Sequence, residues 1–538
     1  MEFCKKIGSE AGETCSAGVK EVLGSQGEGG GQVIRTSLAL AAIHGIPVRL
    51  IEIRAKRSKP GLAAQHLAGV NLLRDVSEGS FTGNVISSKI VSFSPKPKQA
   101  ATELKALNAV EGEPVAGPSY DANVGTAGSI TLVTQITLPY LLFSGRARSF
   151  TLRLTGGSNV SMSPPIEHTQ HVLLPLLKRM LPSMKFGMSL ESRGYFPKGC
   201  GVVSLNLSDI DARGEAIPIN LFRPKVDANA DDNGEGEGVP TDKEVEVSVG
   251  GSSIGGIVWT VSGVVCSQGS DAEKSAVSEC LRSLLETQMG EAMSLQGDTL
   301  GSCEIIIDEI RDGAGGGGDD TAGRGGGWKG KNKQKQKQGK RRRERKETAV
   351  SVCIKGTHVD NTDTDALCAL YHCNVLSDMS DLSEAVAAIA AGAGGLQTSV
   401  TSVDSVDKAT GNSNSNRDKG GKSNILLKLV QDVMFHYHSD AAVDEHTADQ
   451  LIIYQAMAVK SMVSREVQKT GSSDSLRGLI YRITVAPPSQ HTSLHLSTVV
   501  SILNEWSAVS GGEAERCYEI AVNNAECSDC RNIDFTII

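Results

Sequence analysis

Helix-like and strand-like segments alternate along most of this chain, and glycine-rich turns separate many of them. Apolar residues at helical spacing follow the glycines at 27–31, and Gly45 with Pro47 is expected to end that helix. Further segments with helical spacing are 61–73, 126–143, 168–180 and 424–438. Segments with strand-like alternation are 48–56, 149–157, 201–209 and the one that begins at Gly478. This recurrence predicts an α/β protein built from repeated small units.

Three polar stretches interrupt the pattern. The first, about 312–346, is rich in glycine and then in lysine and glutamine, so it has almost no apolar surface to bury. The second, about 397–423, is polar, and the third, 227–242, is acidic and rich in turn-forming residues. The chain has 538 residues, which is enough for two or three domains. The three stretches therefore isolate a middle region from two better-patterned flanks.

The composition argues against several classes of protein. No apolar run reaches the roughly 18 residues of a membrane span, and residues 1–15 lack the apolar core of a secretory signal. We therefore expect an intracellular protein with reduced thiols. Of the 12 cysteines, Cys527 and Cys530 form a CxxC pair, but no second pair stands at a zinc-binding spacing.

Charge is distributed unevenly along the chain. The net charge is −8, but residues 329–346 hold eleven basic residues and one acidic residue, which leaves the rest of the chain near −18. Contacts with nucleic acid would therefore depend on local basic clusters.

The glycine-rich loop GEGGGQ, residues 27–32, brings flexible backbone with N–H groups to the start of a helix, where anions can bind. It lacks the Gly-Lys-Ser/Thr of a Walker loop and fits the GxGxxG pattern poorly. Glu28 stands inside the loop, and its carboxylate would repel phosphate unless a metal ion or a base intervenes. From these residues alone, a phosphate-binding loop and a plain tight turn remain equally open.

A second motif, IRAKRSKPGLAAQHL at 53–67, gathers cations before a Pro-Gly turn. These cations are Arg54, Lys56, Arg57 and Lys59. Four cations at the exit of a strand can contact a polyphosphate or a nucleic acid, and a solvated basic loop is the alternative. Gln65 and His66 then open the next predicted helix.

Four more segments carry polar residues in loops or at helix starts. They are residues 156–171, SRGYFPKGCGVV at 192–203, VDEHTADQLIIYQAMA at 443–458 and APPSQHTSLHL at 486–496. In the last segment, His491 follows a rigid double proline and precedes a helix, where a histidine can act as a nucleophile or a base. A single histidine is structural in most proteins, so both interpretations stay open.

In this order, the six segments resemble the RNA 3'-terminal phosphate cyclase family. The resemblance covers Leu23 to about Val203 and about Ile425 to Leu503, and it is weaker between them. The matching residues are Glu28–Gln32 with Arg35, Ile53–Leu67, Arg193–Gly201 and Asp444–Leu451.

The resemblance implies an α/β fold with a large domain of repeated βαβαββ-like units and an inserted smaller α/β domain. The large domain would comprise residues 21–205 and 440–538, and the inserted domain residues 206–439. The low-complexity insertions at about 312–346 and 397–423 fall inside the inserted domain. Residues 1–20 would form a poorly patterned extension.

The resemblance also implies a reaction, the ATP-dependent conversion of an RNA 3'-phosphate end into a 2',3'-cyclic phosphodiester. The substrates would be ATP and RNA with a 3'-phosphate end, and a divalent metal ion, Mg²⁺ or Mn²⁺, would assist. A histidine attacks the α-phosphate to form a covalent histidine–AMP, AMP passes to the RNA 3'-phosphate, and the neighbouring 2'-hydroxyl displaces it. A phosphate monoester is a poor electrophile until AMP gives it a good leaving group, so covalent steps suit this chemistry. They need a neutral imidazole and a cationic, metal-assisted cradle.

The nucleophile carried over from the family motif is His491, which Thr492 follows as in several members. Its rivals are His495, which would share a helix face with it, and His446, which stands where the family commonly has tyrosine. The residues implied to bind ATP and the RNA end are Glu28, Arg35, Arg54, Arg57, Lys59, Gln65, His66, Gln135, Glu445, His446, Asp449 and Gln450. Glu28 is also the candidate metal ligand.

Four positions depart from the family pattern. The family often has aspartate where Leu23 and Glu167 stand, glycine where Cys200 stands, and threonine where Leu494 stands. None of these changes removes a cation or the nucleophile, although each could alter contacts with the metal ion or the nucleotide.

The alternative function is that of a non-catalytic relative which assists ribosomal RNA processing as a binding protein. Family members of that kind lack the nucleophilic histidine and the intact basic motif. This chain keeps both, which favours the enzyme.

The basic run at 329–346 can be a nuclear-localisation signal, an RNA tether or a solvated insertion. From it we expect a nuclear, nucleoplasmic location, with a cytoplasmic location as the alternative.

Overall fold

The structure is a computed structural model. It describes residues 19–27, 29–96, 117–221, 257–267, 269–296, 298–308, 347–358, 367–391, 424–439, 441–488, 490–507, 517–525 and 530–538. The predictions for Glu28, Cys527, residues 1–18, the basic run and the three polar stretches lie outside the described residues.

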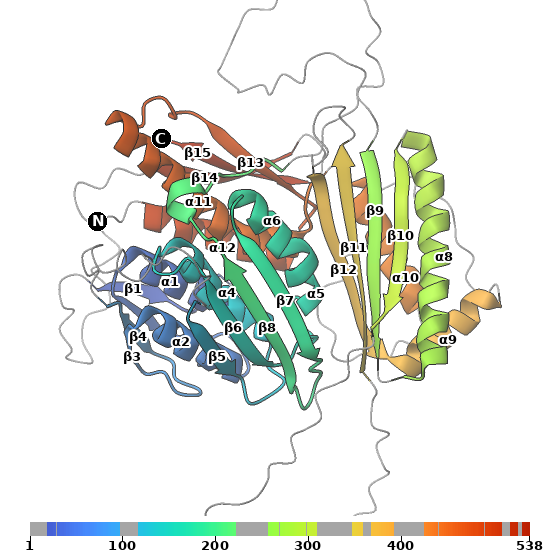
Figure 1. Cartoon of the computed structure of the whole chain (residues 1–538). Helices are drawn as coiled ribbons and strands as arrows, with labels where there is room; N and C mark the ends of the chain where they lie inside the picture. The colour runs from blue at the N-terminus through green and yellow to red at the C-terminus, as the bar shows by residue number, and fades with distance from the viewer. Residues whose placement is uncertain are drawn as a thin grey trace, which may run out of the picture.

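Two four-stranded sheets share one topology (Figure 1). The first has the order β1-β2-β4-β3, with β1 parallel to β2 and the other pairs antiparallel. Its elements are β1 (Lys20–Leu23), α1 (Gly31–His44), β2 (Val48–Ile51), α2 (Ala64–Ser77), β3 (Ser80–Thr82) and β4 (Val91–Ser94). The chain thus passes through β, α, β, α, β and β in turn.

The second sheet repeats this arrangement in the order β5-β6-β8-β7, again with its first two strands parallel. Its strands are β5 (Ser119–Asn123), β6 (Phe150–Gly156), β7 (Lys185–Ser192) and β8 (Gly201–Ser208). The helices are α4 (Ile130–Phe143), α5 (Ile166–His168), the π-helical turn η2 (Thr169–Leu173), α6 (Leu174–Met180) and, after β8, α7 (Ala212–Glu215).

A third sheet completes the larger part of the molecule, with the order β13-β15-β14. Its elements are α11 (Glu445–Thr470), β13 (Ile480–Val485), α12 (Gln490–Ser507), β14 (Tyr518–Asn524) and β15 (Arg531–Ile537). Two isolated parallel bridges, Leu221 with Ile483 and Val443 with Val485, pair short segments with β13. These segments take the place that the parallel first strand has in the other two sheets. The predicted α/β fold with repeated βαβαββ-like units is therefore confirmed.

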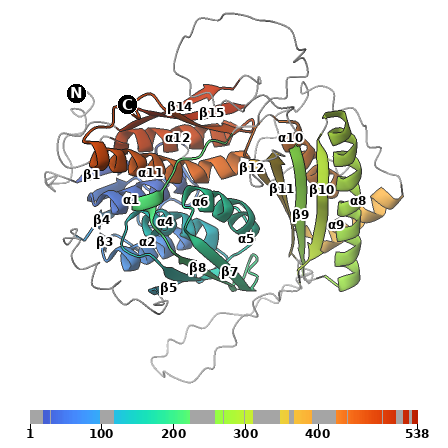
Figure 2. The ribbon, with the colours of Figure 1, turned by 45° about the horizontal axis from the view of Figure 1, so that its top comes forward.

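The middle of the chain forms a fourth sheet with the order β10-β9-β11-β12. Its strands are β9 (Ile257–Ser267), β10 (Thr299–Ile307), β11 (Glu347–His358) and β12 (Leu367–Asp378). The helices α8 (Asp271–Gln296), α9 (Met379–Ala390) and α10 (Ile425–His438) pack on one another and on this sheet (Figures 1 and 2).

Two large apolar cores correspond to these two parts of the molecule. The first joins the three sheets of the larger part and includes Leu221, while the second lies between the fourth sheet and its helices. Cys353 and Leu370 of the fourth sheet belong to the first core, so the two parts are packed against each other. The division of the chain at residues 205 and 440 stays a prediction.

Local geometry explains where the predicted elements differ from those observed. The strand predicted over 48–56 ends at Ile51, because Glu52 and Arg54 both have φ near +52°, which is incompatible with a strand. The helix predicted over 168–180 begins at Ile166 and passes through a π-helical turn. The helix predicted from Thr126 begins at Ile130, where the Ser129 hydroxyl caps it by accepting from the Leu132 N–H.

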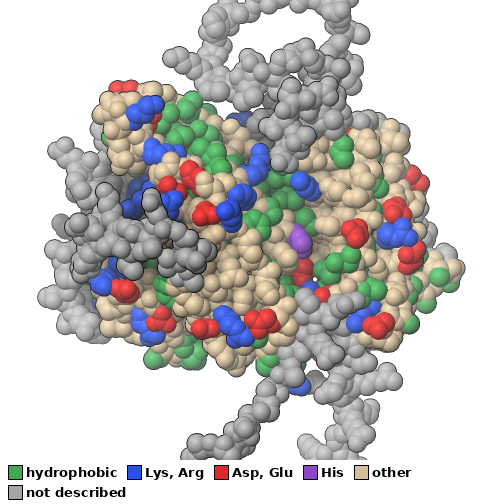
Figure 3. Space-filling view, in the orientation of Figure 1, with side chains coloured by type: hydrophobic (Ala, Val, Ile, Leu, Met, Phe, Trp, Pro, Cys, Tyr) green, Lys and Arg blue, Asp and Glu red, His purple; other side chains and the backbone are tan. Residues whose placement is uncertain are grey.

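Charges on the face shown in Figure 3 are mixed, with basic and acidic side chains interspersed.

Among the helices that the structure describes, none is long and apolar enough to cross a membrane.

Candidate functional site

The glycine-rich loop packs tightly between three helices. A Cβ on Gly31 would overlap Nε2 of His66 and lie 2.8 Å from Nη1 of Arg35, so only glycine lets these side chains approach the start of α1. A Cβ on Gly27 would overlap the hydroxyl of Thr498 in α12. The loop enters α1 through Gly29, at φ +63°, and Gly30, the N-cap residue, which has no side chain to cap the helix. The backbone N–H groups at this helix start therefore have no side-chain cap from their own loop.

His66 is held as a neutral ring beside this loop. Its Nδ1 accepts a hydrogen bond from the Ala63 N–H at 3.2 Å, so the proton of the neutral ring sits on Nε2, which faces Gly31. Burial, and then the charges of Arg35 and Arg54, lower the pKa of His66 to about 3. At neutral pH His66 is thus a hydrogen-bond donor without charge, directed at the glycine-rich loop.

The basic segment after β2 is partly tied to the surrounding backbone. Arg54 donates to the Gly61 carbonyl at 3.0 Å, and burial, followed by the charge of Arg57, lowers its pKa. Lys56 donates to the Gly27 carbonyl at 2.9 Å, so it holds the glycine-rich loop in place. Lys59 is exposed. Of the cations predicted from the sequence, Lys56 thus contacts the glycine-rich loop, while Arg54 is bonded to the backbone of its own segment.

Gln65 connects the second helix to the next unit. Its Oε1 accepts a hydrogen bond from the Ser129 N–H at 3.1 Å, at the start of α4. This bond uses the amide oxygen of Gln65, so the two N–H groups of the same amide remain as hydrogen-bond donors.

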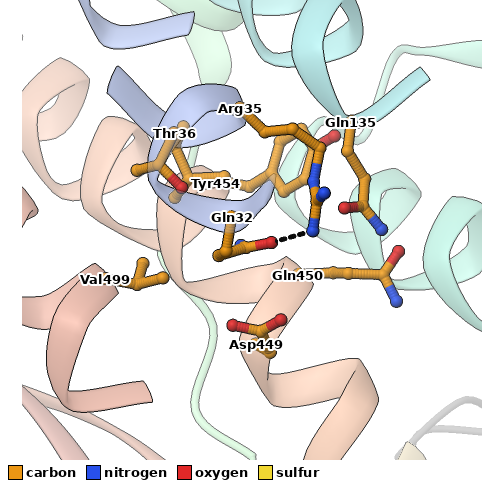
Figure 4. A pocket seen from close by; sticks show the side chains of 9 residues that line it. Gln32, Arg35, Thr36, Gln135, Asp449, Gln450, Tyr454 and Val499 are labelled. Carbon is orange, nitrogen blue, oxygen red and sulfur yellow. Dashed lines mark hydrogen bonds between the residues drawn. The ribbon is translucent and has the colours of Figure 1, made fainter. Parts of the chain in front are cut away.

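Arg35 lies over a narrow cavity of about 20 Å³, roughly the size of one water molecule, where four helices meet (Figure 4). The lining residues are Gln32, Arg35 and Thr36 of α1, Gln135 of α4, Asp449, Gln450, Ile453 and Tyr454 of α11, and Val499 of α12. Burial lowers the pKa of Arg35 to about 10 against the opposing charge of Asp449, so the side chain stays protonated at neutral pH. It donates to Gln32, and its Nε has no partner among the described residues. The cavity is therefore lined by a buried guanidinium cation, and its Nε–H group is left as a hydrogen-bond donor among the described residues.

Four predicted site residues thus converge on this cavity, namely Arg35, Gln135, Asp449 and Gln450. Glu445 and His446 stand about one turn earlier, at the start of α11. His446 is exposed, and its Nε2 lies 3.8 Å from a Glu445 carboxylate oxygen. Neither residue is among those that line the cavity.

The start of α11 is fixed by a buried hydrogen-bond network. Asp444 accepts from the backbone N–H groups of His446, Thr447 and His372, and from the Thr447 hydroxyl at 2.6 Å. Because that hydroxyl gives its proton to Asp444, it accepts from Nε2 of His168 at 2.9 Å. The network links the larger part, through His168, to β12 of the fourth sheet.

We predict that acid weakens the folded state through its buried histidines. Burial lowers the pKa of His66 and His372 to about 3 and that of His168 to about 4. Because the folded values lie below the unfolded value of about 6.5, stability is full above pH ~6.5 and falls as the pH drops towards 4, by up to about 1.4 kcal/mol per pH unit for each histidine. Urea unfolding at pH 7.5, 6.5 and 5.5 measures this slope.

A matched variant tests the origin of the slope. His372→Leu removes a titrating ring whose Nε2 has no partner among the described residues, so it should flatten the dependence on pH by about one histidine's share. A stability that stays constant from pH 7.5 to 5.5 would contradict the prediction.

His491, the predicted nucleophile, is the second residue of α12 and follows β13 after a loop that includes Pro487 and Pro488. Its side chain, like that of His495, lies outside the described residues. The same helix contributes Thr498 against the glycine-rich loop and Val499 to the Arg35 cavity. With a rise of 1.5 Å per residue, His491 stands about 12 Å along the helix axis from Val499.

The resemblance also implies a divalent metal ion. No group of three or more His, Cys, Asp or Glu side chains in the described part of the chain could hold one. Glu28, the candidate ligand, lies outside the described residues.

Several residues that line the Arg35 cavity were not predicted from the sequence. Gln32 lies within the quoted glycine motif, and its position three residues before Arg35 on one helix face was a usable signal. Tyr454 follows Gln450 by one helical turn in the same way. Val499 had no such signal, because its place depends on how α12 packs on α1 and α11.

Comparisons with known proteins show which family the chain matches. A family model described as RNA 3'-terminal phosphate cyclase matches residues 26–505. A protein of Drosophila melanogaster named RNA 3'-terminal phosphate cyclase is 39% identical over 190 residues, which are 35% of this chain and 47% of that protein. Proteins of the same name from Archaeoglobus fulgidus and Nitrosospira multiformis are 38% identical over 194 residues and 40% identical over 189 residues. These alignments cover 36% and 35% of this chain and 53% and 48% of the relatives.

The chain spans about half the length of the curated relatives it matches. The family model, in contrast, extends over most of the chain, including the glycine-rich loop, the basic segment and α12 up to Glu505. This protein belongs to the RNA 3'-terminal phosphate cyclase family.

Proposed function

We propose that this chain converts the 3'-phosphate end of an RNA into a 2',3'-cyclic phosphodiester at the expense of ATP. The observation that carries the proposal is the convergence of α1, α4, α11 and α12 on the buried Arg35, with the neutral His66 and the glycine-rich loop beside it. Such a group of desolvated donors suits phosphate, whose charge they stabilise in a water-poor site. The family and the names of the relatives support the same reaction.

In this proposal His491 is the nucleophile. It stands in the first turn of α12, where the positive end of the helix dipole disfavours a protonated imidazole. A neutral ring nitrogen attacks the α-phosphorus of ATP, a P–N bond forms, and the bond to pyrophosphate breaks as pyrophosphate leaves. His491 and Val499, which lines the Arg35 cavity, stand about 12 Å apart along α12, so the nucleotide would lie between the nucleophile and this cavity.

Two further steps return the enzyme to its starting state. An oxygen of the RNA 3'-phosphate attacks the same α-phosphorus, the P–N bond breaks, and His491 is released. The 2'-hydroxyl oxygen then attacks the terminal RNA phosphorus, AMP leaves with the bonding electrons, and the hydroxyl proton passes to solvent or a base.

The remaining predicted residues would bind and orient these phosphates. His66 and Arg35 would donate hydrogen bonds without a change of protonation, while Arg54, Arg57 and Lys59 would supply positive charge. Gln65, Gln135, Glu445, His446, Asp449 and Gln450 would position the nucleotide and the RNA end. A divalent ion, Mg²⁺ or Mn²⁺, would be held mainly by the phosphates of ATP with Glu28 as a protein ligand, and would neutralise phosphate charge.

Incubation of the full chain with α-labelled ATP and Mg²⁺ or Mn²⁺ tests the proposal directly. We expect labelled protein whose bond is acid-labile, as a phosphoramidate is, and cyclic ends on RNA that carried a 3'-phosphate. A chain that binds 3'-phosphate RNA but never becomes labelled would instead be a non-catalytic relative, such as one that assists ribosomal RNA processing.

For location, we propose that residues 329–346 direct the protein to the nucleus, because this run concentrates eleven basic residues. Deletion of these residues from a fluorescently tagged full chain should shift it from the nucleoplasm to the cytoplasm. Replacement of the run by a Gly-Ser segment of equal length controls for the spacing. An unchanged distribution in both variants would dismiss the signal.

A further inference from the structure

A second, wider cavity opens at the carboxyl ends of the parallel strands β5 and β6. Its volume is about 320 Å³, and it is lined by Asn123, Gly125, Thr126, Thr155, Gly156, Lys198 and Cys200. A Cβ on Gly125 would meet nothing within 4 Å, so the cavity is open at this side. In α/β sheets, ligands bind at this edge of the strands.

The lining of this cavity offers one positive charge and several neutral donors. Lys198 is exposed, and none of the seven lining residues is acidic. Thr126 Oγ1 accepts from the Gly128 N–H at 3.1 Å, so its hydroxyl proton is left to donate. Asn123 Oδ1 accepts from the Gly125 N–H at 2.8 Å, which leaves its amide nitrogen as a donor. One cation with neutral donors matches the single negative charge of a phosphodiester.

The wall of the cavity is held by close backbone packing and by hydrogen bonds. Backbone of Gly199 lies so close to Thr126 that a Cβ there would be 2.5 Å from the Thr126 carbonyl oxygen. Gly199 donates its N–H to the Tyr195 carbonyl at 2.7 Å, and this turn carries Lys198. Beneath it, the Gly194 N–H donates to the Ser158 hydroxyl at 3.0 Å. The turn that presents Lys198 is therefore fixed against the loop that follows β5.

The cavity adjoins the proposed reaction site through Gln65. The loop that carries Thr126 ends at Ser129, whose N–H donates to Gln65, and a Cβ on Gly128 would lie 3.2 Å from Cβ of Gln65. Gln65 precedes His66, which faces the glycine-rich loop. A strand whose 3' end reaches His66 would thus have its preceding phosphodiesters near this cavity.

We propose that this cavity binds a phosphodiester of the RNA strand upstream of its 3'-phosphate, with Lys198 as the charged contact. The inference rests on the proposed function for the identity of the strand. The triphosphate of ATP offers the same chemistry, but its several charges call for more than one cation. The single lysine of this cavity is matched to one backbone phosphate.

Lys198→Gln tests the charged contact, and Lys185→Gln, an exposed lysine paired with Asp209 on the same sheet, is the matched control. Binding of a 3'-phosphorylated RNA 10-mer to the full chain is measured as a function of salt. We expect Lys198→Gln to weaken binding about 5- to 10-fold and to reduce the slope of log K against log salt by about 0.7, since one phosphate contact is lost. The control should bind as the unchanged chain does.

A nucleoside 3'-monophosphate and ATP separate the possible sources of phosphate. The monophosphate has a 3'-phosphate and no upstream phosphate, so its affinity should be the same for Lys198→Gln and the unchanged chain. Lys198→Gln should also need no more ATP for half-maximal self-labelling. A raised requirement for ATP, or RNA binding equal to that of the control, would overturn the proposal.

Cys200 gives an independent readout because its thiol lines the same cavity and is partly exposed. We expect the RNA 10-mer to slow alkylation of Cys200 by iodoacetamide, as followed by mass spectrometry, while Cys280 of α8 reacts as before. Protection by ATP alone would contradict the assignment. If the chain never becomes labelled by ATP, yet RNA protects Cys200 and binding depends on Lys198, the reaction fails and the RNA site stands.

Discussion

The His491→Ala variant is expected to form no histidine–AMP and to make no cyclic RNA ends, a loss of at least about 10³-fold in rate. The physical reason is that no other group in the proposed mechanism can form the P–N bond. Hydrogen-bond donors that stabilise the transferred phosphate would remain, but they have no nucleophile to assist. Labelling with α-labelled ATP, followed by gel analysis and by RNA end analysis, measures both losses.

The matched control is His495→Ala, since His495 stands one helical turn later on the same helix. We expect this variant to label as the unchanged chain does. Full labelling of His491→Ala together with loss of labelling in His495→Ala would assign the nucleophile to His495 and contradict the proposed mechanism.

Folding must be checked in the same series, because α12 packs on α1 and α11. His491 lies in the first turn of α12, before the residues that pack on the glycine-rich loop and the Arg35 cavity, so its truncation should leave the urea unfolding midpoint unchanged within error. A pre-formed RNA-adenylate should also still be cyclised by His491→Ala. That last step needs the donors and not the nucleophile.

Local features of the fold could be predicted because they depend on neighbouring residues. The glycine-rich loop, the end of α1 at Gly45 and the start of α2 near Gln65 follow from glycine conformation and helix capping. The early end of β2 could not be predicted. It depends on the positive φ values of Glu52 and Arg54, and these residue types normally avoid positive φ, so the sequence does not indicate them.

In the candidate site, too, some features could be predicted from the sequence and others could not. Its basic and polar residues could be named from motifs, because they are written along the chain. His66 is neutral because it is buried beside Arg35. This burial depends on how α1 and α2, which are separate in the sequence, pack on each other. Likewise, Gln135 meets Asp449 only through the packing of α4 and α11. A pattern names the residues, whereas tertiary packing sets their charge states.

The second large effect concerns Arg193, which is 4% exposed and joins the two parts of the molecule. It donates to Glu167 of α5, to Asn159 at 3.0 Å and to Asp308, which follows β10 of the fourth sheet. Burial alone would lower the pKa of Arg193, but the charge of Glu167 and other nearby groups raises it above its usual value. The guanidinium is therefore the counter-charge of two buried carboxylates.

We expect Arg193→Met to destabilise the protein by about 3–5 kcal/mol, because it leaves Glu167 and Asp308 buried without a cation. Urea unfolding measures this loss. The control is Arg153→Met on strand β6. Its partner Glu191 is exposed, so the loss of this pair should cost less than about 1 kcal/mol.

A second variant separates the lost attraction from the uncompensated charge. Glu167→Gln with Asp308→Asn in the Arg193→Met background removes both carboxylate charges and should recover a large part of the lost stability. Because Asp308 and Glu167 belong to different parts, we also expect Arg193→Met alone to split a single unfolding transition into two. An Arg193→Met protein within 1 kcal/mol of the unchanged chain would show that packing between the two cores, and not this ion cluster, holds the parts together.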